Sequence, residues 1–143
     1  MILKVVMALT GLVMVGFLLM HMYGNLKAFL GADSFNHYAE WLKSDVLYPL
    51  VPHGVFIWIF RLVMLASIVA HMYAAAVLTG RAHAARSSKY VTTKRLAQTY
   101  AARTMRWGGV IIALGLVFHI LQFTAQVATT GFSAGASPYD MII

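Results

Sequence analysis

The sequence predicts an all-α integral membrane protein with three transmembrane helices. Of its 143 residues, 61% are hydrophobic and only 10% are charged, and the mean hydropathy is +0.76. A water-soluble domain of this size would need a far more polar surface. The apolar residues fall into three runs, at about 5–23, 54–79 and 107–129. At ~1.5 Å rise per residue, each run is long enough to cross a hydrocarbon core of ~30 Å.

The first and third runs contain no charged residue, and Arg61 alone interrupts the second. Lys4 and Lys27 bracket the first run. That run is long enough to span and is not followed by a convincing small-residue cleavage site, so we expect a membrane helix rather than a signal peptide. We treat residues 1–143 as a single membrane-anchor domain.

The two loops between the spans differ sharply in charge. The loop at 25–53 mixes Lys27 and Lys43 with three acidic residues, whereas the loop at 80–106 carries seven basic residues and no acid. The positive-inside rule therefore places the basic loop and the N-terminus in the cytoplasm, and the 131–143 tail outside. Residues 95–106 are expected to form a short surface helix or a docking face for a soluble partner. This topology accounts for the net charge of +7, so we expect no nucleic-acid partner.

Each span contains one histidine: His21, His71 and His119. An ionisable side chain at membrane depth is costly and usually functional. Imidazole is a good iron ligand, and a pair from facing helices can hold a b-type haem. The alternative is a hydrogen bond across a helix interface, which suits one such histidine better than three. The chain has no cysteine, which excludes zinc–thiolate and iron–sulfur ligation through sulfur.

The depth of each histidine follows from its distance to the cytoplasmic edge of its span. His21, His119 and His71 lie ~26, ~20 and ~15 Å from that edge, so His119 can pair with either of the others. Gly16, Ser67 and Gly115 lie four or five positions before the histidines and leave room for a flat macrocycle, although small residues are common at any transmembrane interface. Arg61 either neutralises a haem propionate or extends its side chain to the interface.

Three segments together resemble a known family. MALTGLVMVGFLLMHMYGNLKAF (7–29) resembles the first helix of the cytochrome b membrane anchor of succinate dehydrogenases and fumarate reductases. Its specific features are TG, a histidine ten residues beyond the glycine, and GNL. RLVMLASIVAHMYAAAVLTGRAHAAR (61–86) and YAARTMRWGGVIIALGLVFHILQF (100–123) resemble the second and third helices. Order and spacing match over nearly the whole chain.

The resemblance implies part of a haem-binding bundle that has five spans and four ligating histidines in the single-chain, two-haem anchor. His21 and His119 then hold the outer haem b, and His71 supplies one ligand of the inner one. The fourth histidine belongs to a helix for which this sequence has no counterpart. SPYDMII at the end looks like its lead-in, so we expect the chain to be cut short or completed by a further small membrane subunit.

The implied function is a non-catalytic membrane subunit of a respiratory succinate:quinone oxidoreductase in the bacterial cytoplasmic membrane. A flavoprotein subunit oxidises succinate, an iron–sulfur subunit relays electrons, and the anchor passes them to quinone, for which menaquinone is the expected type. Glu40 is the candidate carboxylate of the quinone site, with a solvated loop acid as the alternative. Two other functions stay open: a cofactor-free structural anchor, and the haem b subunit of a different oxidoreductase, such as a hydrogenase or nitrate reductase.

Overall fold

The computed structural model describes residues 1–85 and 97–143, together with the side chains of those residues except 97–99 and 101–103. The described parts are all-α. They comprise α1 (Ile2–Leu26), the short 3-10 helix η1 (Lys27–Leu30), α2 (Ala32–Ser44), α3 (Val55–Ala84), α4 (Ala97–His119) and the π-helical turn η2 (Ile120–Thr124). The chain divides into two compact units, residues 1–87 and 88–143, which we describe separately.

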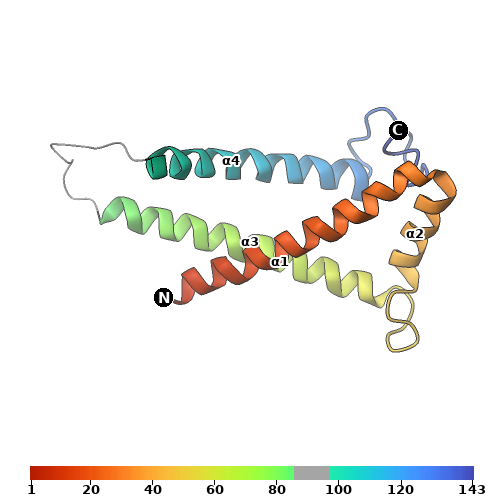
Figure 1. Ribbon diagram of the computed structural model, residues 1–143, viewed down its shortest axis with the longest axis horizontal. Coiled ribbons are helices and arrows are strands. Elements are labelled where there is room, and N and C mark those ends of the chain that lie inside the picture. Colours follow the sequence, from red (N-terminus) through yellow and green to blue (C-terminus); the bar gives the residue numbers. More distant parts are fainter. Residues whose placement is uncertain (86–96) are drawn as a thin grey trace. The chain divides into compact units, whose positions relative to one another are not determined.

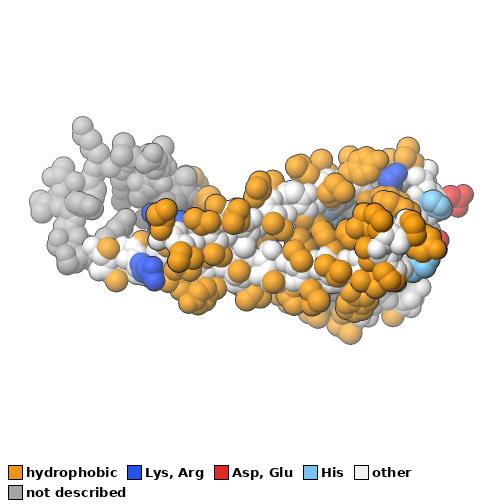
Figure 2. Space-filling model, turned by 90° about the horizontal axis from the view of Figure 1, so that it is seen from below, with side chains coloured by type: hydrophobic (Ala, Val, Ile, Leu, Met, Phe, Trp, Pro, Cys, Tyr) orange, Lys and Arg blue, Asp and Glu red, His pale blue; other side chains and the backbone are white. Residues whose placement is uncertain are grey.

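Three helical segments are long and apolar enough to cross a membrane. Within the described residues they are Ile2–Leu30, Val55–Ala84 and Thr104–Thr124. Hydrophobic side chains cover most of the helix surface visible in Figure 2. By length and composition, therefore, the described part of the chain has three candidate spans, which indicates a multi-pass membrane protein, as the hydropathy of the sequence predicts.

In the first unit, α1 and α3 cross and pack against each other in opposite directions (Figure 1). The less exposed residues of both helices recur at alternating intervals of three and four, which places them on one face of each helix. We call these two facing stripes the seam. The seam consists of Leu3, Met7, Thr10, Met14, Phe17, His21 and Gly24 on α1, and of Ile57, Phe60, Met64, Ser67, His71, Ala74 and Leu78 on α3.

The segment expected to be a loop, 25–53, contains the helix α2, which connects the neighbouring ends of α1 and α3 (Figure 1). Gly31 begins this helix with φ of 92°, a conformation that glycine adopts without strain. Phe35 is buried. Tyr38 packs so tightly on Gly24 that a Cβ atom there would lie 2.9 Å from the ring. α2 therefore caps the end of the helix pair that includes His21.

The third span ends earlier than the apolar pattern predicts. Helical structure stops at Thr124 rather than near 129, and the chain then turns at Gln126, where φ is 53°. The side chain of Gln126 fixes this turn, because its oxygen accepts a hydrogen bond from the Gly135 N–H at 2.8 Å. The amides of Val127 and Ala128 point back to the Leu121 carbonyl oxygen. At the other end, α4 already begins at Ala97, so the expected surface helix at 95–106 is, over its described part, the start of α4.

Candidate functional site

His71 lies in the seam and contacts α1 directly. Its Nδ1 atom is 3.1 Å from the Oγ1 atom of Thr10. The backbone of α1 comes close at the next residue, because a Cβ atom built on Gly11 would lie 3.5 Å from Cε1 of His71. The TG pair of α1 therefore forms one wall of the His71 environment.

The hydrogen bonds of Thr10 determine which nitrogen of His71 carries the proton. A threonine hydroxyl has one proton to donate. In Thr10 that proton points to backbone carbonyls of its own helix, with Val6 O at 2.7 Å and Met7 O at 3.3 Å. With its proton directed to a carbonyl, Oγ1 can accept a hydrogen bond from His71, and this arrangement favours the tautomer that is protonated at Nδ1. Nε2 then keeps its lone pair, which is the form of imidazole that ligates a metal.

His21 lies near the other end of the seam and has a different kind of partner. Its Nδ1 atom is 3.2 Å from the amide nitrogen of Asn25, one turn later on the same helix. An amide can present either its nitrogen or its oxygen after a half-turn, so Asn25 can serve either tautomer of the ring. The His21 ring also lies 5.2 Å from that of Phe17, which in turn lies 5.7 Å from Phe60 of α3.

The two seam histidines lie at different levels of the helix pair. His71 contacts Thr10, and His21 follows Thr10 by eleven positions, which is ~16 Å along α1 at ~1.5 Å per residue. On α3, His71 follows Phe60 by eleven positions, and the Phe60 ring contacts that of Phe17, one turn before His21 on α1. Because a metal–imidazole bond is ~2 Å long, two ligands of one iron have their nitrogens ~4 Å apart. His21 and His71 therefore cannot bind the same iron atom.

His119 belongs to the second unit and is the last residue of α4 before the π-helical turn. A π-turn is a common way for a helix to end. The His119 ring is exposed within its unit and lies 5.0 Å from that of Phe123, which stacks on Phe132 at 5.7 Å. Among the described residues of this unit, no side chain beyond the immediate neighbours lies within 4 Å of a Cβ built on Gly115, one turn earlier.

The donor set and its surroundings suit a haem. Imidazoles in an apolar helix pair are the kind of ligand that a b-type haem requires. Gly16 has open space beside it, as does Gly115, whereas Ser67 is packed into the seam with 9% exposure. Ser67 therefore contributes to helix packing, and room for a macrocycle beside the histidines stays a prediction.

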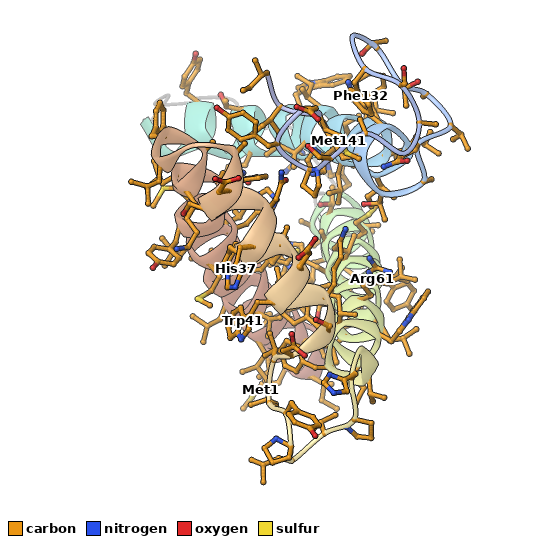
Figure 3. All side chains as sticks on the ribbon, turned by 90° about the vertical axis from the view of Figure 1, so that its right-hand side faces the viewer. Met1, His37, Trp41, Arg61, Phe132 and Met141 are labelled. Carbon is orange, nitrogen blue, oxygen red and sulfur yellow. The ribbon has the colours of Figure 1, made fainter. Side chains whose placement is uncertain are left out.

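Arg61 and Glu40 both lie away from the seam. The Arg61 guanidinium is exposed and stacks over the Trp58 ring, 5.0 Å from its centre. Figure 3 shows Arg61 on α3, with His37 and Trp41 one turn apart on α2. Glu40 is exposed on α2 and does not line the open hollow of about 620 Å³ beside it. That hollow is lined by Lys27, Asp33, Ser34, His37, Tyr38 and Trp41.

The sequence analysis singled out all three histidines but not Thr10 or Asn25, the residues that hold two of them. The signal was present, since Thr10 belongs to the TG pair and Asn25 to the GNL triplet of the first helix. Among the residues that the structure describes, no three histidine or acidic side chains converge as they would at a preformed metal centre. A haem iron needs only two protein ligands, so the arrangement is compatible with haem.

Comparison of the chain with models of protein families, with curated proteins and with solved structures finds no match.

Proposed function

We propose that this chain is a haem b-binding membrane anchor of a respiratory succinate:quinone oxidoreductase. The observation that carries the proposal is the His71–Thr10 contact, which leaves Nε2 of a membrane histidine ready to coordinate. A second support is the ~16 Å offset between His71 and His21, because a two-haem anchor needs ligands at two levels. The resemblance of the three spans to such anchors supplies the partner enzyme.

In this function His21 and His119 ligate one haem, and His71 supplies one ligand of another. Haem b, when bound, supplies a one-electron carrier whose potential depends on its ligands and burial. The chain's own residues keep the carriers at separate depths and exclude water around them. Two imidazole ligands per iron also leave no open coordination position for oxygen.

The remaining parts of the proposal concern the two faces of the membrane. The basic segment at 80–106 is the proposed cytoplasmic docking surface for the iron–sulfur subunit, which joins it to the flavoprotein. Residues 86–96 of this segment lie outside the part of the chain that the structure describes. A quinone, with menaquinone as the expected type, is reduced near the opposite face, where Glu40 is the proposed proton donor.

A pyridine haemochrome assay on the purified complex that contains the full chain tests the proposal. We expect haem b at one or two equivalents per chain, with a reduced-minus-oxidised spectrum typical of two axial imidazoles. A matched control is His83→Leu, since His83 lies at the end of α3 beyond the seam and should leave haem content unchanged. A fully assembled complex without haem b would overturn the proposal.

The second candidate is a cofactor-free anchor of the same kind of complex. It is favoured by the fact that Thr10 and Asn25 already give both seam histidines a hydrogen-bond partner within the helix pair. This function predicts that His71→Leu and His21→Leu assemble and transfer electrons normally. A haem b subunit of another oxidoreductase would contain haem but would copurify with a different soluble partner.

A further inference from the structure

We propose that Thr10 is a positioning residue that fixes the tautomer of His71 and aims its Nε2 atom away from α1. The inference rests on the proposed haem function for its purpose, although the geometry of the pair is independent of that function. Thr10 lies on α1 and His71 on α3, so the packing of the two helices brings the ligand and its hydrogen-bond partner together.

The first step is that Thr10 itself is held in one orientation. Its hydroxyl donates to the carbonyl four residues earlier at 2.7 Å, a common arrangement for threonine within helices. Because this hydroxyl donates its one proton to that carbonyl, its oxygen can accept the Nδ1–H of His71 at 3.1 Å. Met7 and Met14 flank Thr10 on α1, and Ser67 lies one turn before His71 on α3, but the described contact of Nδ1 is to the Thr10 hydroxyl.

The second step concerns direction. The two nitrogens of an imidazole flank Cε1 and point in widely different directions. Cε1 and Nδ1 of His71 lie within 4 Å of a Cβ built on Gly11 and Nε2 does not, so Nε2 is turned away from this part of α1. The ring lies close to α1 at Gly11, where an added Cβ would make an ordinary contact of 3.5 Å with Cε1, so this approach does not depend on a glycine. A second protein ligand for an iron held by Nε2 of His71 would therefore come from an element other than this part of α1.

The third step concerns strength. A ligating histidine whose other N–H donates to a fixed acceptor is oriented and made more basic, and loss of such a partner typically weakens metal binding 10–100-fold. Because the more basic ligand stabilises the oxidised iron, its loss should also raise the midpoint potential of the haem at His71.

Three variants of the full chain test the role of Thr10. Thr10→Val keeps the shape of the side chain and removes the acceptor, and Thr10→Ser restores it. The matched control is Thr104→Val, because Thr104 makes the same bond to the carbonyl four residues earlier, at 3.0 Å to Tyr100 O, without a histidine partner. The control separates the loss of a helix back-bond from the loss of the contact to His71.

Two measurements are made on these variants. Nitrogen-15 NMR of histidine-labelled, haem-free protein in lipid reports the tautomer of His71. We expect an Nδ1–H signal in the parent, Thr10→Ser and Thr104→Val proteins, and a shift toward Nε2–H in Thr10→Val. On the haem-loaded complex, we expect Thr10→Val alone to lose haem at the His71 level 10–100-fold more readily and to raise its midpoint potential.

The outcomes separate this inference from the proposed function. If the parent protein binds no haem, but Thr10→Val still shifts the tautomer of His71, the haem function is wrong and the role of Thr10 in setting the tautomer stands. An unchanged tautomer in Thr10→Val, or equal haem loss in Thr10→Val and Thr104→Val, would overturn the inference about Thr10, whatever the haem content of the parent.

Discussion

The vertical offset of the histidines gives the sharpest prediction about this chain. His21→Leu, His71→Leu and His119→Leu are made singly and in pairs in the full chain, within its complex. Leucine preserves the apolar surface of each helix and removes only the ligand. If His21 and His119 share one iron and His71 serves another, each single variant should lose one haem and retain the other.

The magnitude follows from the helix geometry. Thr10 and His21 are separated by eleven residues, or ~16 Å, whereas ligands of one iron are ~4 Å apart at their nitrogens. The effects of His21→Leu and His71→Leu should therefore add, and the double variant should lose all haem b. The effects of His21→Leu and His119→Leu should not add, because the second change removes a ligand from a haem already lost.

Haem per complex is measured by pyridine haemochrome, and the surviving haem is followed by redox titration. The surviving haem should titrate at one potential after His21→Leu or His119→Leu, and at a different one after His71→Leu. Loss of all haem in each single variant would refute the assignment to two levels. Additive loss in the His21 and His119 pair would refute their pairing.

Three further predictions concern residues around the histidines. Gly24→Ala should destabilise the first unit by about 1–3 kcal/mol, because the new Cβ would lie 2.9 Å from the Tyr38 ring. Gly11→Ala should leave the stability nearly unchanged, since the nearest contact of its new Cβ is 3.5 Å. The denaturation midpoints of the Gly24→Ala and Gly11→Ala proteins in detergent test this difference. Arg61→Leu should lower the midpoint potential of one haem, because it removes a positive charge, and Arg61→Lys should retain that potential. An unchanged potential in both variants would mean that Arg61 only packs on its neighbouring tryptophan at the membrane interface. Glu40→Gln should slow quinone reduction without changing haem content, and full turnover in this variant would exclude Glu40 as the proton donor.

The spans were predictable because hydropathy alone identifies a segment that must satisfy its backbone internally in lipid. α2 was not predicted, because a 13-residue helix that includes Asp33, His37 and Glu40 is too polar to stand out by hydropathy. The sequence predicted the end of the third span too late because Val127 and Ala128 are apolar and extend the hydrophobic run. In the structure, their N–H groups donate to the Leu121 carbonyl oxygen in a turn that follows the helix.

The histidines could be recognised from sequence, but the contact that prepares His71 could not. Thr10 and His71 both lie on the less exposed stripe of their helices, but this stripe is visible only in the structure, because apolar residues cover the other faces of α1 and α3 as well. Which residue of α1 lies level with which residue of α3 depends on how the two helices cross, and spacing within one helix carries no such information. Depths counted from the basic residues at the cytoplasmic edge of each span put His21 and His71 about 11 Å apart, less than the ~16 Å rise along α1. The two values differ because the long basic side chains that mark these edges reach the interface over variable distances.

The different partners of the two seam histidines lead to a last prediction. His21 is held by Asn25 of its own helix, whereas His71 is held across the seam by Thr10. A change that spreads α1 from α3 should therefore disturb His71 and spare His21. Ala74, one turn after His71 and fully buried, is the position at which a larger side chain would act as such a wedge.

Ala74→Leu should weaken haem binding at the His71 level 10–100-fold, since the 3.1 Å contact to Thr10 breaks, and should leave the His21 level intact. Ala76→Leu is the matched control, because Ala76 is exposed on the same helix two positions later. Haem content and the potential of each haem distinguish the outcomes. Equal loss at both levels in Ala74→Leu would mean that packing of α1 on α3 supports the two histidines alike, and that their separate partners do not make them independent.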